Sequence, residues 1–463
     1  MPISPDAELP SAPASATESS LLLSRGQQKY EGTVFQKYIF IMALNSYALL
    51  YGAAISSFGI IILPVEMGVL FPTGHALSLS VALGVAGVSQ LICPIAGFVS
   101  DNHVSVHGKR RIPMIIGTIG CVVGLFILAY FRQRKLGEAY LVVFGITMCF
   151  LNVAYSVWVG LVADVVCRYP ELNRLNSSFV GAFQMLGSVG GVMGIGYVFG
   201  VENTYYVFAA TATICCTLVC FAGQERPNLE AQEWSIRDII DCFRISPTSH
   251  GDFFWVFVSR TLYYMGVSAQ CFCFYYLRDI LGRLNPTRDT ATQASVSQIF
   301  AAVSALVISN HLDVYGKKFL IRCACFVLCT VYIFYAFTVS FMQCLVLVTF
   351  YGIGNGIYLA ADFSMAVDAL PDSSKRARDM GLWGVAAFIG CMLGPCIGGP
   401  LLELFGHTLA APSVVPDARY VRSGFVILMF SGCLWSFLSA FTLRFVTVGE
   451  PAGPKSLEEE THE

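Results

Sequence analysis

Two charged residues stand deep inside long apolar segments of the chain. Arg260 lies in FVSRTLYYMG, and Asp362 lies in YLAADFSM. A charge inside a lipid bilayer costs several kcal/mol unless it is paired or faces water. The depths of the two residues in their segments agree, so we expect them to pair within one helical bundle.

This pair supports two interpretations. In the functional one, Asp362 is a carboxylate that binds and releases a proton, and Arg260 is its partner or an anchor for a bound solute. In the structural one, the pair is buried and only fixes two helices against each other.

Uncharged polar and aromatic side chains recur in the middle of the apolar segments. Amides and hydroxyls can bond to a polyol while aromatic faces stack on its apolar side, so these side chains are candidates for a solute cavity. They equally suit core packing and anchoring at the membrane interface. The candidates are Asn45, Gln90, Asn152, Tyr155, Trp158 and Gln184 in the first half of the chain and Tyr263, Gln270, Gln298, Asn355 and Tyr358 in the second.

The amino-acid composition indicates that these apolar segments lie in a lipid bilayer. Charged residues make up 13% of the 463 residues and hydrophobic residues 56%, whereas soluble domains carry roughly 25% charged residues. The mean hydropathy is +0.65. The seventeen cysteines lie mostly inside apolar segments, without paired CxxC spacing, so we expect neither a metal nor a cofactor. We expect no nucleic-acid partner, although the net charge of −2 does not bear on this, because in a membrane protein the positions of the basic residues matter instead.

Twelve apolar runs are long enough to cross a bilayer, which takes about 20 residues in a helix. They predict an all-α membrane protein with two six-helix bundles. The expected parts are a disordered cytosolic tail over 1–35, bundles over 36–222 and 251–446, a cytosolic linker over 223–250 and a cytosolic tail over 447–463. The runs lie near 36–62, 76–99, 112–131, 138–166, 176–200, 203–222, 251–281, 291–311, 318–340, 342–370, 379–405 and 422–446.

Lysine and arginine placement predicts the orientation. If both termini are cytosolic, most lysines and arginines between the runs lie on the cytosolic side. Basic residues of membrane proteins prefer that side, so we expect both termini to be cytosolic. In the N-terminal tail, Glu18 followed by Leu22 and Leu23 fits an acidic dileucine sorting pattern. The expected location is therefore the plasma membrane or an endosomal or lysosome-like membrane.

Two charged turns repeat one arrangement, which implies two copies of one bundle. The first charged turn, within GFVSDNHVSVHGKRRIPMIIG, comprises Asp101, Gly108, Lys109, Arg110 and Arg111. The second, within NHLDVYGKKFLI, comprises Asp313, Gly316, Lys317 and Lys318. The halves also match at Asp164 and Asp368, which end the fourth and tenth runs. Glycines of the fifth run (Gly187, Gly190, Gly191 and Gly194) and of the eleventh run (Gly390, Gly394, Gly398 and Gly399) predict close helix packing.

The first charged turn resembles the signature of the major facilitator superfamily, G-x-x-x-D-x-x-G-[RK]-x-[RK]-[RK], with a longer gap between Asp101 and Gly108. That longer gap, followed by basic residues and Pro113, is similar to the glycoside-pentoside-hexuronide cation symporters and the sucrose/proton symporters. The phrase RDMGLW over residues 378–383 also resembles sugar-porter relatives.

The resemblance implies transport by alternating access, with the charged turns as a conformational gate. It places Asp101 against the cytosolic N-terminus of the eleventh helix, where the basic residues of the first charged turn hold it while the cytosolic side is closed. The second charged turn would act in the same way against the fifth helix. The alternative is that these charges only set the topology.

We therefore expect a secondary active transporter, a proton-coupled symporter of a small polar organic solute such as a sugar or glycoside. The partners would be the solute, protons and the bilayer. An antiporter is an alternative, because GCMLGPCIGG over residues 390–399 has the form of a drug/proton antiporter motif, although that motif belongs in the fifth helix. A non-transporting nutrient sensor is another. An enzyme is not expected, because the chain has no GxSxG or HExxH motif and no histidine in the middle of a run.

Overall fold

The computed structural model describes residues 32–71, 74–106, 108–223, 225, 251–309, 311–370, 376–406 and 420–448, without the side chains of Arg174, Asp313 and residues 376–382. The dileucine pattern, most of the predicted linker and most of both predicted tails lie outside these residues. Every regular element in the described part is a helix, which confirms the predicted fold class.

The first group of helices occupies the N-terminal half. Its elements are α2 (Val34–Ser57), η1 (Phe58–Ile62), α3 (Leu63–Leu70), α4 (His75–Ser89), α5 (Ile92–Asp101), α6 (Arg111–Arg134), α7 (Gly137–Arg168), η2 (Pro170–Leu172), α8 (Asn173–Gly194), η3 (Ile195–Phe199) and α9 (Gly200–Ala222). The first run was predicted to end at residue 62, but the helix continues to Leu70. Pro64 is tolerated there because it stands in the first turn of α3, directly after the π-helical segment η1.

The second group follows in the C-terminal half. Its elements are α11 (Gly251–Val267), η4 (Ser268–Phe272), α12 (Cys273–Tyr275), η5 (Tyr276–Ile280), α13 (Pro286–Ser309), α14 (Leu312–Tyr315), α15 (Lys317–Tyr335), α16 (Phe341–Asp368), α17 (Arg376–Gly406), α18 (Arg422–Thr442) and η7 (Leu443–Phe445).

Ten helical segments of the described chain are long and apolar enough to cross a membrane. One of them, Leu175–Ala222, has 48 residues and would extend about 70 Å if straight, more than twice the roughly 30 Å hydrocarbon core. It turns at Gly200, whose φ of 67° is readily adopted by glycine, so we count it as two spans. The interrupted helix from α11 to η5 is not among the ten, so the predicted count of twelve is reached only if this helix crosses the membrane as well.

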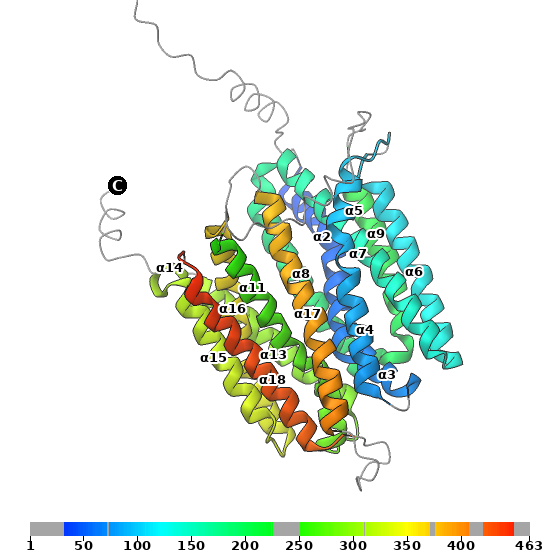
Figure 1. Ribbon diagram of the computed structural model, residues 1–463. Coiled ribbons are helices and arrows are strands. Elements are labelled where there is room, and N and C mark those ends of the chain that lie inside the picture. Colours follow the sequence, from blue (N-terminus) through cyan, green and yellow to red (C-terminus); the bar gives the residue numbers. More distant parts are fainter. Residues whose placement is uncertain are drawn as a thin grey trace, which may run out of the picture.

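The helices pack as two neighbouring bundles, α2–α9 and α11–α18 (Figure 1). Between the bundles, α4 packs against α17 and α8 packs against α13. We call the end at which α6 and α15 begin, uppermost in Figure 1, the basic end. Lys109 and Arg110 directly precede α6, and Lys317 is the first residue of α15. The end that carries His75, Arg278 and Tyr420 is the opposite end.

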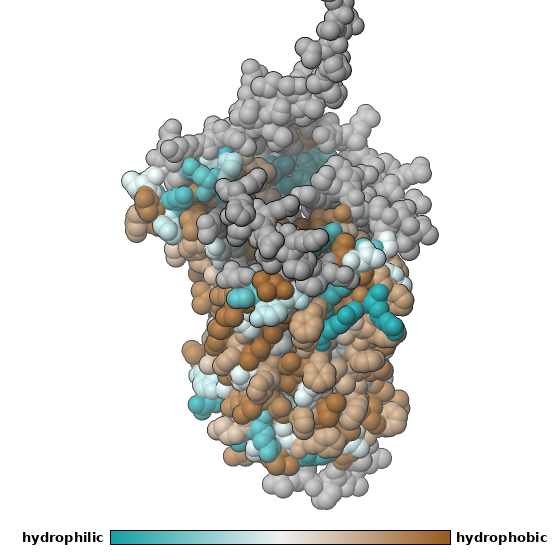
Figure 2. All heavy atoms as spheres, turned by 90° about the vertical axis from the view of Figure 1, so that its left-hand side faces the viewer, coloured by the Kyte–Doolittle hydropathy of each residue, from teal (hydrophilic) through white to brown (hydrophobic). Residues whose placement is uncertain are grey.

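Glycines allow several of these helices to approach closely. A side chain on Gly187 would collide with the carbonyl of Leu49 in α2, and one on Gly390 would collide with the carbonyl of Thr261 in α11. Gly190 meets no neighbouring atom within 4 Å, so it serves no close approach. The flank of the second bundle is mostly hydrophobic below its upper end (Figure 2), with Leu306, Phe319 and Phe326 exposed. This surface suits contact with lipid.

Candidate functional site

A buried ion pair lies at the centre of the second bundle. The Arg260 guanidinium, on α11, donates a hydrogen bond to Oδ2 of Asp362, on α16. Arg260 is 6% exposed and Asp362 is not exposed at all. The structure thus joins the two charges that the sequence singled out, and their pairing reduces the cost of holding either of them within the membrane.

Aromatic rings surround the arginine. Its guanidinium carbon lies 3.5 Å from the ring centroid of Trp383 on α17 and 4.9 Å from that of Tyr264 on α11. Such cation–π contacts contribute about 0.5–2 kcal/mol each, more when they are desolvated. The sequence analysis named neither aromatic residue as a site residue. Tyr264 follows Arg260 by four residues on the same helix, so helical spacing could have found it. Trp383 lies on a different helix, which the sequence does not place beside α11.

Several polar atoms around the pair make no hydrogen bond of good geometry, although the Tyr358 hydroxyl and the Trp383 indole lie near enough to Asp362 to stabilise its charge. They are Asp362 Oδ1, Arg260 Nε, the Tyr358 hydroxyl and Trp383 Nε1, all buried. Buried polar groups are nearly always hydrogen-bonded, so these atoms are candidate contacts for a polar solute. We call Arg260, Asp362, Tyr264, Tyr358 and Trp383 the central polar site.

Each bundle carries a copy of one tyrosine–tyrosine–asparagine unit. In the second bundle, Tyr263 stacks on Tyr358 with ring centroids 3.2 Å apart and donates a hydrogen bond to Asn355 Oδ1 at 2.8 Å. In the first bundle, Tyr51 stacks on Tyr155 at 3.5 Å and donates to Asn152 Oδ1 at 3.1 Å. In both copies the asparagine precedes the stacked tyrosine by one helical turn.

One helix of the central polar site also packs against the first bundle. This helix is α17, which carries Trp383 and packs against α4. A side chain on Gly87 of α4 would collide with Met392 of α17. The ion pair itself lies within the second bundle.

Other predicted cavity residues have different surroundings. The Asn45 amide donates to Asn176 Oδ1 at 2.8 Å, and Trp158 Nε1 donates to the carbonyl of Leu44 at 2.8 Å, so both side chains bond within the first bundle. Gln90 caps the end of α4, where that helix gives way to α5. Gln184 is exposed on α8, and Gln298 is half-buried on α13.

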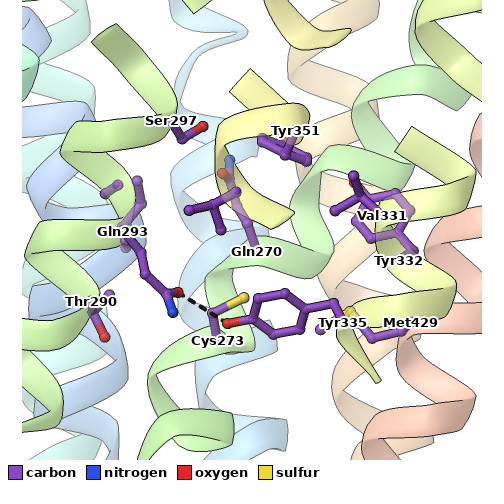
Figure 3. A pocket seen from close by; sticks show the side chains of 13 residues that line it. Gln270, Cys273, Thr290, Gln293, Ser297, Val331, Tyr332, Tyr335, Tyr351 and Met429 are labelled. Atoms are coloured by element: carbon purple, nitrogen blue, oxygen red, sulfur yellow. Dashed lines mark hydrogen bonds between the residues drawn. The ribbon is translucent and has the colours of Figure 1, made fainter. Parts of the chain in front are cut away.

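Gln270 lines a small cavity of about 50 Å³ in the second bundle (Figure 3). Across the cavity, Gln293 accepts a hydrogen bond from the Tyr335 hydroxyl at 3.0 Å, while its buried Nε2 has no partner. Ile60 of the π-helical segment η1 reaches the cavity from the first bundle. The cavity thus lies where the irregular segments η1 and η4 approach α13. Gln293 was missed because nothing in one helix's sequence shows that its side chain faces such a space.

In the first charged turn, Arg110 joins two carboxylates. Its guanidinium bonds to Asp101 and, through Nε at 3.1 Å, to Asp164 at the end of α7. Lys109 Nζ lies 3.4 Å from each carboxylate. The basic residues therefore hold together helices of their own bundle. The expected position of Asp101 against the start of the eleventh helix involves side chains outside the described residues.

Glu225 adds a carboxylate that the sequence analysis did not select. It accepts hydrogen bonds from the backbone N–H groups of Arg110 and Arg111 at 2.9–3.1 Å, at the N-terminus of α6, where a negative charge is favoured. Burial nevertheless raises the pKa of the Glu225 carboxyl. In return, the Arg111 guanidinium donates to the carbonyl of Gly223 at 3.0 Å.

The second charged turn repeats part of this arrangement. Lys317 Nζ bonds to Asp368 at 2.5 Å, as Lys109 and Arg110 bond to Asp164, and Lys318 is buried. The side chain of Asp313 is not described. Gly108 and Gly316 both have positive φ, 95° and 79°, which explains why glycine stands before the basic residues in each copy.

The hydrogen bonds recorded between the two bundles lie towards the opposite end. They join Tyr275 to Pro64 and His75, Arg278 to His75, Tyr420 to Ala76, Thr292 to Tyr197 and Cys396 to Ser80. Within the described residues, the ion pairs of the basic end each stay inside one bundle. The conformation is therefore closed at the opposite end.

The described helices thus form two bundles with long apolar helices, and the central polar site lies inside the second of them. A sequence model of the Major Facilitator Superfamily matches residues 256–462. The sucrose transport protein SUC4 of Arabidopsis thaliana is 24% identical over 141 residues, a match that covers 27% of this chain and 27% of that protein. The match thus spans about a quarter of this curated relative.

Solved structures of three transporter chains have a similar fold. A mutant of the nucleoside transporter NupG matches with a TM-score of 0.68 at 14% identity, over 89% of this chain and 100% of its own. A second structure of NupG matches with a TM-score of 0.65 at 15% identity, over 88% of this chain and 99% of its own. The human organic anion transporter MFSD10 (TETRAN) matches with a TM-score of 0.58 at 14% identity, over 87% of this chain and 99% of its own. At such identities the likeness shows the fold alone. The sequence match, the homologue and the fold together support the major facilitator superfamily, which the first charged turn also resembles.

Proposed function

We propose that the protein is a secondary active transporter that carries a small polar organic solute, in symport with protons, by alternating access between its two bundles. A sugar or glycoside is the favoured solute, with a nucleoside next. The weak similarity to a sucrose transport protein and the fold shared with a nucleoside transporter support these two classes. The basic end would face the cytosol, as the lysine and arginine distribution predicts.

The unpartnered polar atoms around the Arg260–Asp362 pair are the observation that carries this proposal. A solute with hydroxyl groups could supply donors to Asp362 Oδ1 and acceptors to Arg260 Nε and Trp383 Nε1. The faces of Tyr51 and Tyr155 would contact the apolar side of a ring. Each of these groups is neutral or paired, which suits a solute without net charge.

Asp362 is the group proposed to carry the coupling proton. Protonation would remove its charge and weaken its bond to Arg260, which would free the guanidinium to bind the solute. Loss of the proton would restore the ion pair and displace the solute from the arginine. Solute and proton would thereby be bound together and released together, which is the requirement for symport.

The test is uptake by the purified full-length protein in liposomes, across a panel of labelled sugars, nucleosides and amino acids, with and without a pH gradient. Accumulation of one solute only when protons can flow inwards with it would support symport. Accumulation driven by protons flowing the other way would favour an antiporter. Binding without flux of any panel member would favour a sensor and contradict the proposal.

A further inference from the structure

A cluster of side chains from both bundles closes the opposite end. The Tyr275 hydroxyl donates to the carbonyl of Pro64 at 2.9 Å, and the Tyr420 hydroxyl accepts from the backbone N–H of Ala76 at 2.8 Å. Arg278 Nη2 lies 3.4 Å from Nδ1 of His75. We call this set the closing cluster: Pro64, His75 and Ala76 of the first bundle with Tyr275, Arg278 and Tyr420 of the second.

His75 is the centre of the closing cluster. It is the first residue of α4, yet it is only 2% exposed. Its ring centroid lies 5.9 Å from that of Tyr275 and 6.4 Å from that of Tyr420. An imidazole that touches both bundles can alter the contact between them when its charge changes, because histidine titrates near neutral pH.

The ionisable groups of the described residues that face the imidazole come from several elements. Arg278 binds Asp279 in η5 through Nε at 2.5 Å and Nη2 at 3.1 Å. Glu403 on α17 accepts a hydrogen bond from the Tyr420 hydroxyl at 2.7 Å. Burial raises the pKa of the Tyr420 phenol, so it remains a neutral donor to Glu403. Both carboxylates are therefore already engaged by other side chains.

The contact with Arg278 requires His75 to be unprotonated at Nδ1. A guanidinium has N–H donors and no acceptor, so it can bond only to a ring nitrogen that carries a lone pair. Protonation at Nδ1 would set two donors and two positive charges against each other 3.4 Å apart. The N-terminal end of α4 also disfavours a positive charge there. Acid thus removes one of the contacts that join the bundles.

We propose that His75 is a proton-binding site of the closing cluster, and that its protonation from the solution at the opposite end separates the two bundles there. This site is distinct from Asp362, which lies in the other bundle and deeper in the membrane. It requires no knowledge of the transported solute. It also gives a direction: acid on the opposite side favours opening towards that side.

The experiment measures the separation of the bundles at the opposite end by fluorescence energy transfer. Click-reactive amino acids at Leu136 and Leu284, exposed residues of the first and second bundles, would carry the two dyes in the full-length protein in nanodiscs. The seventeen cysteines make thiol labelling unsuitable. Energy transfer should fall as the pH is lowered from about 8 to about 5, the range in which histidine changes its charge.

Two variants decide whether His75 is responsible. His75→Gln should stay closed throughout, because the glutamine oxygen accepts from Arg278 at every pH. Arg278→Gln should lose most of the response, because protonated His75 would then meet an amide oxygen; this variant tests the proposal even if His75→Gln folds poorly. His311→Gln, at the basic end, should respond like the wild type. A wild type that does not respond, or a His75→Gln variant with an unchanged midpoint, would overturn the proposal.

Discussion

Replacing Arg260 by alanine would leave the Asp362 carboxylate buried without its partner. Breaking a buried ion pair by removing one member typically costs about 3–5 kcal/mol. The variant also loses the cation–π contacts with Trp383 and Tyr264, which add about 0.5–2 kcal/mol each. Asp362→Asn should be milder, because the amide oxygen can still accept from Arg260 and the guanidinium keeps its aromatic neighbours.

The double variant Arg260→Ala with Asp362→Asn separates the pair from its surroundings. It leaves no buried charge, so it should unfold at a higher temperature than Arg260→Ala alone, although the two variants have the same number of heavy atoms. A double-mutant cycle on thermal unfolding in detergent should give a coupling energy at the upper end of the roughly 0.5–3 kcal/mol seen for contacting residues. A double variant no more stable than Arg260→Ala would refute the argument that charge pairing decides stability here.

Transport by the Asp362→Asn variant distinguishes coupling from architecture. If Asp362 carries the proton, this variant should lose accumulation driven by a pH gradient. It should still exchange labelled for unlabelled solute at equal concentrations, because exchange requires alternating access without net proton movement. Accumulation against a gradient by Asp362→Asn would place the proton site elsewhere and leave the ion pair as a structural feature.

Other predictions concern the basic end and the topology. Asp101→Asn should spare expression but shift the ratio of the two transport conformations about 5–30-fold, because the lost contact is worth about 1–2 kcal/mol. The rate of solute exchange measures this shift. A normal rate would mean that the first charged turn only sets the topology. Gly108→Ala should lower the free energy of unfolding by about 1–3 kcal/mol, because the φ of Gly108 is 95° and the new methyl would collide with Glu225. The control Gly181→Ala on α8 should not lower it, because a methyl there meets no atom within 4 Å. Equal midpoints of thermal unfolding for the two variants would refute this. Antibodies should reach tags at residues 10 and 235 only after the membrane is permeabilised, and should reach a tag at residue 412 from outside. A tag at residue 235 that is exposed on intact cells would contradict the proposed orientation.

The sequence by itself determined the membrane class, the segments that cross the bilayer and the two charged turns. These follow from hydropathy and charge along a single segment, and a local property can be read without knowing its neighbours. The agreement in depth between Arg260 and Asp362 also came from position along each helix. The structure supports the fold class, and the family and homologue matches support the superfamily that the charged turns resemble.

Only the tertiary structure decided which side chains meet. Asn45 and Trp158 were as good cavity candidates as Tyr358, yet their polar atoms bond inside the first bundle. Gln293 and Trp383, which sequence analysis passed over, face the cavity and the guanidinium respectively. The rotation of each helix about its own axis sets these outcomes. That rotation depends on how neighbouring helices pack, through close approaches such as Gly187 against α2 and Gly390 against α11, and no single segment encodes it.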